Sequence, residues 1–433
     1  MAGKKMAWMH SPITGGALLV AATVAALVWA NLYPDYYHHF WHATVWQVGK
    51  GTQDVYSINL HAIANEFLMA IFFFFIGLEI KRELLDGELS SVRKAALPVV
   101  AALGGVIVPV LIYFAFNGGT ETSHGWGVPM ATDIAFALGV LALLGSKVPL
   151  TLKVFLSALA IGDDLMAVLV IAIFYTSEIN FGDLVYGLVG LAILTVANRL
   201  GVRQAWIYYL TGLGIVWVGF LASGVHATIA GVAVAFTVPS RRGMEMNVYL
   251  DRVKQLLKNL ESERHDKGDV LSKKAIKTLK KIKILSYEAS NPLQLKEKAL
   301  HPLTALFIVP FFALGNAGIP INQEVLSQLL NPIALGVSLG LLIGKPVGIY
   351  LFTRALVTLG LGSLPDGVTW RHILGAGFLA GMGFTMSIFI TDLAFTAEVN
   401  QMTSKMAVLV ASVISGVIGY VLLATGPAPK LSN

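Results

Sequence analysis

Four charged residues stand inside long apolar stretches of the sequence, at positions where charge is costly. They are Asp133, Asp163, Asp164 and Lys345. A charged side chain at the centre of a lipid bilayer costs between about 2.5 and more than about 10 kcal/mol, depending on how the cost is measured. Charged residues at such positions are functional candidates by default, so these four are the first candidates for binding or moving ions.

Asp163 and Asp164 are adjacent, and the pair suggests a particular chemistry. Neighbouring residues on a helix point about 100° apart, so one carboxylate can face a cavity while the other faces another helix or a lysine. Two carboxylates in one site of low dielectric constant do not both ionise easily, so the pair can hold a proton near neutral pH. Small hard cations such as Na⁺ and Li⁺ favour the same oxygen ligands. The pair therefore predicts competition between cation and proton, which gives exchange if the site opens to one side at a time.

Two apolar stretches contain residues that interrupt a helix. Pro129 weakens the first of them just before Thr132 and Asp133, and the glycine-containing run 381–387 marks a second break late in the chain. Interrupted segments in corresponding halves of a membrane protein are typical of transporter binding sites. If half-helix ends meet there, Asp133 would offset the positive N-terminal ends and Lys345 the negative C-terminal ends.

The composition indicates the elements that carry these residues. Of 433 residues, 56% are hydrophobic and 13% are charged, whereas a soluble protein has about 25% charged residues, so several soluble domains are excluded. The chain has no cysteine, which excludes thiol catalysis and cysteine metal sites. A bilayer core needs roughly 20 apolar residues as a helix. We therefore predict an all-α polytopic membrane protein with twelve spans, near 14–31, 60–80, 96–116, 126–144, 151–176, 182–198, 205–221, 224–239, 301–318, 331–353, 372–396 and 404–424.

The distribution of lysine and arginine predicts the topology. The first apolar run could be a signal peptide, but a first membrane helix is favoured. With twelve spans, 28 basic residues fall on one side and 2 on the other, which by the positive-inside rule places both termini in the cytoplasm. The chain then divides into spans 1–8 over 1–239, with a short outer segment at 32–59, a cytoplasmic loop at 240–298, and spans 9–12 over 299–433.

The loop 240–298 carries 15 basic and 8 acidic residues, so its net charge of +7 exceeds the +6 of the whole chain. Leu250, Val253, Leu257 and Leu260 recur at helical spacing. A basic amphipathic helix can lie on anionic lipid or hold a partner, but a solvated helical connector between two halves is the favoured interpretation. Nothing in the loop indicates binding to nucleic acid.

The outer segment 33–60 is rich in histidine and aromatic residues. A histidine cluster can bind a metal, but an interfacial aromatic belt with a short strand-like cap is favoured. Asp392 and Glu79, each near an end of a span, are more readily interpreted as structural. An intramembrane aspartyl protease would need glycine where Ala160 stands, so we predict that the protein is not an enzyme and uses no cofactor.

Several runs resemble the NhaA-type bacterial sodium/proton antiporters, and the resemblance covers nearly the whole chain outside 240–296. The matching runs are 77–84, 131–145, 158–164, 223–228, 316–318, 344–346 and 381–390. The resemblance implies an inverted-repeat fold with two interrupted, crossing helices. It also implies electrogenic export of Na⁺ or Li⁺ in exchange for protons, in support of pH homeostasis and salt tolerance. The family works as homodimers in the bacterial inner membrane.

The resemblance also implies roles for individual residues. Asp164 would be the principal cation ligand and proton carrier, with Asp163 beside it and with Thr132 and Asp133 lining the crossing. Lys345 would pair with Asp163 or carry a proton itself. The candidates for a pH response are Glu79, Glu297, His226 and His301.

Two positions depart from the family pattern. Gly162 stands where members have a bulkier residue, which could loosen the helix before the aspartates, and Lys298 replaces a histidine of the pH-sensing run. These departures leave the pH range of activity open. An alternative function from another class is a cation channel, or a membrane sensor that binds Na⁺ without exchange.

Overall fold

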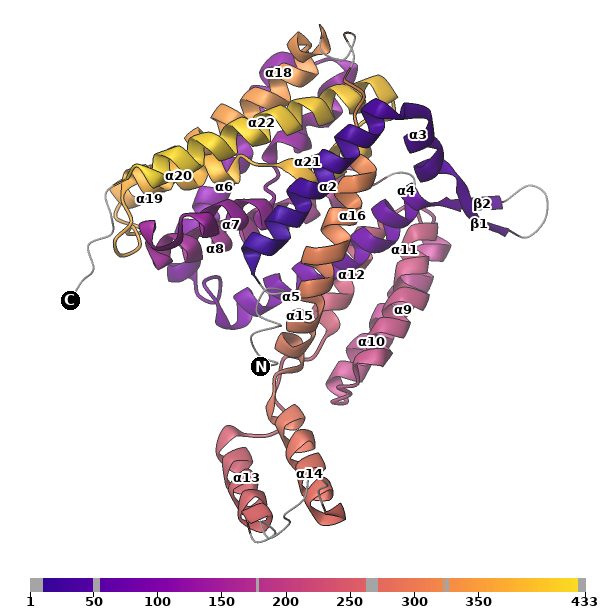
Figure 1. Cartoon of the computed structure of the whole chain (residues 1–433), viewed down its shortest axis with the longest axis vertical. Coiled ribbons are helices and arrows are strands. Elements are labelled where there is room, and N and C mark those ends of the chain that lie inside the picture. Colours follow the sequence, from indigo (N-terminus) through magenta and orange to yellow (C-terminus); the bar gives the residue numbers. More distant parts are fainter. Residues whose placement is uncertain are drawn as a thin grey trace.

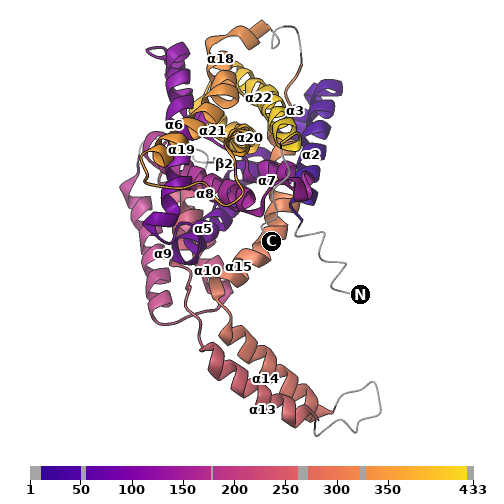
Figure 2. The same ribbon diagram turned by 90° about the vertical axis from the view of Figure 1, so that its left-hand side faces the viewer.

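The computed structural model describes residues 11–49, 55–176, 179–261, 272–321, 323 and 327–426. The chain folds into a bundle of helices, and a two-helix hairpin, α13–α14, projects from one end of the bundle (Figures 1 and 2). A small antiparallel strand pair, β1–β2, lies at another edge of the bundle.

The first half of the chain, to the end of the eighth predicted span, contains the following elements, in which η marks a 3-10 or π-helical segment. They are α2 (Pro12–Leu32), α3 (Pro34–His42), β1 (Thr44–Gly49), β2 (Val55–Asn59), α4 (Leu60–Ala62), η2 (Ile63–Leu68), α5 (Met69–Asp86), α6 (Val92–Asn117), η3 (Glu121–Met130), α7 (Ile134–Leu143), η4 (Gly145–Lys147), α8 (Leu150–Phe174), α9 (Phe181–Arg199), α10 (Ala205–Thr211), η5 (Gly212–Trp217), α11 (Val218–Ala222) and α12 (Ala227–Thr237).

The second half begins with the projecting hairpin and ends with the last long helix. Its elements are α13 (Met246–Glu261), α14 (Lys273–Ala289), α15 (Pro292–Leu303), η6 (Thr304–Ile308), α16 (Val309–Asn316), η7 (Gln328–Leu330), α18 (Pro332–Leu339), η8 (Gly340–Gly344), α19 (Lys345–Thr358), α20 (Trp370–Ala380), α21 (Phe384–Ala394) and α22 (Glu398–Ala424).

The helices confirm the predicted fold class. Within the described residues, ten helices are long and apolar enough to cross a membrane, and the pair α20 and α21 adds a span bent by 46°. The shorter apolar helix α12 corresponds to the eighth predicted span, 224–239. All twelve predicted spans therefore have a helical counterpart, and the protein is an all-α polytopic membrane protein embedded in a lipid bilayer.

Close packing between α6 and α19 fixes the position of Lys345, the first residue of α19. A Cβ on Gly104 of α6 would overlap the backbone carbonyl of Gly348. Because neither residue has a side chain, the two helix backbones approach closely, as is common between membrane helices. The ammonium group of Lys345 is thereby held in the protein interior, where the residue is fully buried.

One continuous helix runs from the base of the hairpin through the bundle. It comprises α15, η6 and α16, 25 residues from Pro292 to Asn316. Its start follows from local sequence, because the side chain of Asn291 accepts a hydrogen bond from the N–H of Leu293 and Pro292 occupies the first turn. The helix that forms the ninth span thus begins at Pro292, inside the predicted loop.

The projecting hairpin is anchored at its base by Arg203, in the turn between α9 and α10. The Arg203 guanidinium donates hydrogen bonds to the backbone carbonyls of Glu288 at 3.0 Å, Ser290 at 2.8 Å and Arg241 at 3.3 Å. The N–H of Gly243 also donates to the Glu288 carbonyl at 2.9 Å, so the two ends of the hairpin lie side by side. The hairpin itself extends away from the spans (Figure 2).

The predicted outer aromatic segment forms α3 and the strand pair. Tyr37 and Trp41 of α3 are buried, and the Tyr37 hydroxyl donates to the carbonyl of Leu314 on α16 at 2.7 Å. Tyr36 and Trp46 are exposed, as expected of an interfacial belt. The strands confirm a strand-like cap, and the part of the chain that the structure describes contains no group of three or more His, Asp or Glu side chains placed to hold a metal.

Candidate cation and proton site

The two predicted interruptions cross each other inside the bundle. Residues 131–133 separate the 3-10 helix η3 from α7, and residues 381–383 separate α20 from α21. The two breaks are bonded directly, because the N–H of Asp133 donates to the carbonyl of Met382 at 2.8 Å. Backbone groups that each helix leaves unpaired are therefore partly satisfied by the other break, as the bilayer interior requires.

Asp133 binds the starts of two half-helices. Its Oδ1 accepts a hydrogen bond from the N–H of Phe136 at 3.0 Å, which makes it the N-cap of α7. Its Oδ2 accepts from the N–H of Thr385 at 3.2 Å and from the Thr385 hydroxyl at 2.5 Å, at the start of α21. One carboxylate thus faces the positive ends of two helix dipoles, which stabilises its charge in the protein interior.

Lys345 takes the opposite position. Its Nζ donates to the backbone carbonyl of Met130, the last residue of η3, and to Oδ2 of Asp163 at 2.5 Å. The ammonium group therefore lies at the negative end of a half-helix and forms an ion pair with a carboxylate. The side chains of Lys345 and Asp163 are 0% and 1% exposed, so the pair is fully buried.

The two adjacent aspartates on α8 have different partners. Oδ2 of Asp163 also accepts a hydrogen bond from the Thr132 hydroxyl at 2.6 Å. That hydroxyl lies 2.8 Å from the carbonyl of Ala380 as well, and since it carries one hydrogen it donates to one of them at a time. Oδ1 of Asp163 and Oδ2 of Asp164 are buried with no hydrogen-bond partner among the described residues. Asp164 is the less constrained of the two carboxylates.

A cleft of about 580 Å³ lies beside the first half of α8. Ser157 and Ala158 line it on α8, and Glu83, Glu88 and Lys153 supply charged groups. Ala158 is six residues before Asp164, or roughly 9 Å along a helix axis. By the predicted topology this cleft lies on the cytoplasmic side, and Asp163 and Asp164 are buried beyond its inner end.

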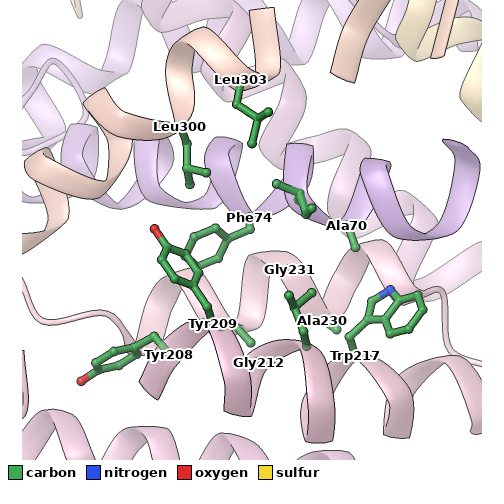
Figure 3. A pocket seen from close by; sticks show the side chains of 13 residues that line it. Ala70, Phe74, Tyr208, Tyr209, Gly212, Trp217, Ala230, Gly231, Leu300 and Leu303 are labelled. Atoms are coloured by element: carbon green, nitrogen blue, oxygen red, sulfur yellow. The ribbon is translucent and has the colours of Figure 1, made fainter. Parts of the chain in front are cut away.

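A second cavity, of about 140 Å³, is apolar and lies between α5, α10, α12 and α15 (Figure 3). Phe74, Tyr209, Gly231 and Leu300 are among its lining residues, and Trp217 stands at one end (Figure 3). None of the described residues that line it carries a charge. A small hard cation needs oxygen ligands, so this cavity does not serve as the ion site.

Glu79 and Glu297, two of the four candidates for a pH response, come together at the C-terminal end of α5. The Arg82 guanidinium contacts the carboxylates of Glu297 at 3.0 Å, Glu83 at 2.6 Å and Glu79 at 4.0 Å. His301 lies one turn after Glu297 on α15, and its ring packs edge-on against Phe75, with 6.0 Å between ring centres. We call Arg82 and its three carboxylate partners, Glu79, Glu83 and Glu297, the Arg82 cluster.

His226 lies apart from the Arg82 cluster. Its Nε2 is 2.6 Å from the carbonyl of Tyr175, beyond the far end of α8. Gly162, the residue before the aspartates, sits in an uninterrupted helix, and a Cβ there would meet the Cβ of Ala102 at an ordinary 3.5 Å. The glycine therefore does not open the helix at this point.

Sequence reasoning missed two groups that complete the site. Thr385 had been noted as part of a break, but not as the partner of Asp133. The sequence signal for Thr385 is a hydroxyl residue two positions after Gly383, where α21 starts and the carboxylate of Asp133 needs a hydrogen-bond donor. The carbonyl of Met130 had no sequence signal, because every residue carries one.

Two interrupted helices that cross at buried charges are typical of secondary transporters. A family model described as "Na+/H+ antiporter 1" matches residues 6–423 of the chain. The chain belongs to this family, and it exchanges Na⁺ for H⁺ across a membrane. A channel or a sensor without exchange is not favoured by this match.

Named relatives agree with the family match over more than nine-tenths of their length. The chain is 63% identical over 430 residues to Na(+)/H(+) antiporter NhaA 1 of Psychromonas ingrahamii, covering 99% of this chain and 98% of that protein. It is 48% identical to Na(+)/H(+) antiporter NhaA of Oleidesulfovibrio alaskensis, covering 95% and 91%. It is 44% identical to Na(+)/H(+) antiporter NhaA of Helicobacter pylori strain G27, covering 96% and 94%. These relatives are transporters.

Proposed function

We propose that Asp164 is the principal carrier of Na⁺, Li⁺ and protons in this antiporter, with Asp163 as the second ligand. The observation that supports this assignment is the buried Oδ2 of Asp164, which has no hydrogen-bond partner among the described residues. An unpaired carboxylate in a site of low dielectric constant holds either a proton or a cation, because an isolated charge there costs several kcal/mol. Asp164 is therefore the group at which the two ions compete.

Alternating access converts this competition into transport. With the cleft beside α8 open, a cytoplasmic Na⁺ reaches Asp164 and displaces its proton. Thr132 and Asp133 line the crossing while the site turns outward. The carboxylate of Asp133 compensates the positive ends of the two half-helices during this step. Protons from the outer side then drive Na⁺ off the carboxylates, and the site returns.

Lys345 has two possible roles in this cycle. In one, its ammonium group only compensates the charge of Asp163, which it contacts at 2.5 Å. In the other, Na⁺ binding at Asp163 breaks the ion pair and Lys345 gives up a proton of its own. Either role is compatible with movement of more than one proton inward per cation expelled, which makes the exchange electrogenic.

Purified protein in proteoliposomes with an internal pH dye tests the proposed exchange. A pulse of Na⁺ should move protons, and collapsing the membrane potential with K⁺ and valinomycin should speed the movement several-fold, because a net charge crosses in each cycle. A rate that does not respond to valinomycin would mean electroneutral exchange. A dye signal that does not respond to Na⁺ would contradict exchange itself and restore the channel or sensor.

We also infer that the Arg82 cluster sets the pH response from the cytoplasmic side. Glu79 and Glu297 share one guanidinium, so the charge state of one carboxylate changes the hold on the other. His301, on the same helix as Glu297, and His226, at the other end of α8, are the remaining candidates. We further propose that the chain works as a homodimer in the bacterial inner membrane, with both termini in the cytoplasm.

Deleting most of the projecting hairpin should leave antiport intact if the hairpin is a connector. Because Gly243 and Glu288 are hydrogen-bonded neighbours, residues 245–287 can be replaced by a short Gly-Ser linker without moving the helices they join. Na⁺-driven proton movement by the shortened protein should match that of the full chain within about twofold, the range of context effects on a connector. If the deletion variant remains monodisperse in detergent but no longer transports, the hairpin is required for exchange and is more than a connector.

A further inference from the structure

A second buried ion pair lies away from the crossing, between α21 and α22. Nζ of Lys405 is 2.6 Å from Oδ1 of Asp392, and both side chains are 12% exposed. One residue before each of them, the hydroxyls of Thr391 and Ser404 are 2.8 Å apart. By the predicted topology these four residues are at the outer end of the bundle, so two polar links close α21 against α22 there.

Polar groups from other helices adjoin this ion pair. His61 of α4 has its Nε2 3.1 Å from Oδ1 of Asn316, at the end of α16, and α16 packs against α21. The side-chain amide of Asn316, in turn, donates to Oδ1 of Asn65 at 2.8 Å. Four elements, α4–η2, α16, α21 and α22, therefore meet in one polar cluster, which we call the outer cluster.

A layer of three phenyl rings separates the outer cluster from the crossing. Phe389 of α21 packs against Phe73 of α5, with 5.6 Å between ring centres, and against Phe312 of α16, with 6.2 Å. All three rings are buried. Phe389 is one turn from Thr385, which binds Asp133, and Phe312 is one turn from Asn316. The rings thus occupy the space between the charged crossing and the outer surface.

We propose that the Asp392–Lys405 ion pair is the outer gate of the ion pathway, with the three phenyl rings as the seal beneath it. The proposal rests on the alternating-access site described above. The cleft beside α8 ends at Ala158 on the side of the bundle that the predicted topology makes cytoplasmic. Alternating access needs a second closure on the opposite side, and this closure must open in each cycle. Both side chains of the pair are 12% exposed, so water can reach the two charges when they separate.

The position of α21 connects the gate to the crossing. Thr385, in the first turn of this helix, is hydrogen-bonded to Asp133. Asp392 lies two turns further along the helix, on the same face. A shift of α21 relative to α22 therefore separates Asp392 from Lys405 and moves Phe389 together with the charged site. Asp392 and Lys405 act through position, because they pair with each other, whereas Asp163 pairs with Lys345 at the crossing.

The absence of cysteine from the natural chain makes a direct test of sidedness possible. Ile388, fully buried on α21 between Thr385 and Asp392, is replaced by cysteine, and right-side-out vesicles are treated with a membrane-impermeant thiol reagent. Ile388→Cys alone should react slowly. Adding Asp392→Asn or Lys405→Met should speed labelling by about tenfold or more, as expected when a closed population is shifted towards an open one.

Charge exchange and a neutral control separate gating from general loosening. The double change Asp392→Lys with Lys405→Asp should restore slow labelling of the cysteine. Gln401→Met removes a hydrogen bond from Gln401 Nε2 to the carbonyl of Phe395, in the same outer turn of α22, and should leave labelling slow. Equal labelling rates in all variants, or equal acceleration by Gln401→Met, would overturn the gate.

The outcomes for the gate and for the transport site are independent. If exchange requires Asp164 but the cysteine labelling rate does not change when Asp392 or Lys405 is substituted, the gate proposal is rejected and the assignment of the transport site is retained. If labelling follows the ion pair but exchange does not need Asp164, the assignment of the carrier residue fails instead. Thermal stability of each variant in detergent identifies any that has lost its fold, and the charge-exchanged protein then provides the decisive comparison.

Discussion

Asp164→Asn should abolish Na⁺-driven proton movement, with a loss on the order of 100-fold or more, because an uncharged amide neither attracts a hard cation as a carboxylate does nor carries a titratable proton. The substitution keeps the shape of the side chain. It also leaves the Asp163–Lys345 ion pair and the Thr132 hydrogen bond in place, so the fold should persist. The measurement is the initial rate of dye-reported proton flux after a Na⁺ pulse in proteoliposomes.

Asp183→Asn provides a matched control for this loss. Asp183 lies in the first turn of α9, away from the crossing, and the same change of charge there should leave the flux unchanged. Exchange by the Asp164→Asn protein at the rate of the unmodified chain would show that another group carries the ions. Asp163 would then be the next candidate, because its Oδ1 is also buried without a partner among the described residues.

Lys345→Ala should destabilise the protein by about 3–5 kcal/mol, the cost of leaving a buried carboxylate without its partner. Both members of the pair are fully buried, and the lysine also satisfies the carbonyl of Met130 at the end of η3. Removing the ammonium group leaves both the Asp163 carboxylate and the Met130 carbonyl without the hydrogen bond that Lys345 donates to them. The loss should appear as a lower thermal midpoint in detergent and as a smaller free energy of unfolding in a denaturant titration.

A double variant separates the ion pair from loss of packing. Lys345→Met with Asp163→Asn removes both charges while keeping most of the side-chain volume, and buried pairs replaced as a unit often cost little. Its stability should recover most of the deficit of Lys345→Ala, although its transport should not recover. If Lys345→Ala melts at the temperature of the unmodified protein, the buried pair does not hold the site together.

The spans could be predicted from the sequence because lipid imposes a strong rule on every residue that faces it. Long apolar runs were sufficient to place a helix at each of the twelve predicted spans, although the eighth, α12, is short. The start of the ninth helix at Pro292 could not be found this way. Polar residues such as Lys296 and Glu297 lower the mean hydropathy of α15, so a search for apolar runs does not detect its start. The start is set instead by the side-chain cap of Asn291.

The residues of the candidate site could be predicted, but most of their partners could not. A charge in a span is visible in one dimension, so Asp133, Asp163, Asp164 and Lys345 stood out. Their partners are set by packing between segments far apart in the chain, as for Asp133 with Thr385, 252 positions away. Near the outer surface, where charge is not conspicuous, Asp392 was interpreted as structural.

The unbroken helix from Pro292 to Asn316 has a mechanical consequence. At 25 residues it is roughly 37 Å long. It joins the base of the hairpin to Glu297 of the Arg82 cluster, to Phe312 in the aromatic seal and to Asn316 in the outer cluster. The π-helical segment η6 near its middle is the place where such a rod can absorb a small change of register. One helix therefore connects the base of the hairpin to the opposite end of the bundle, with η6 as the point where its two halves can move relative to each other.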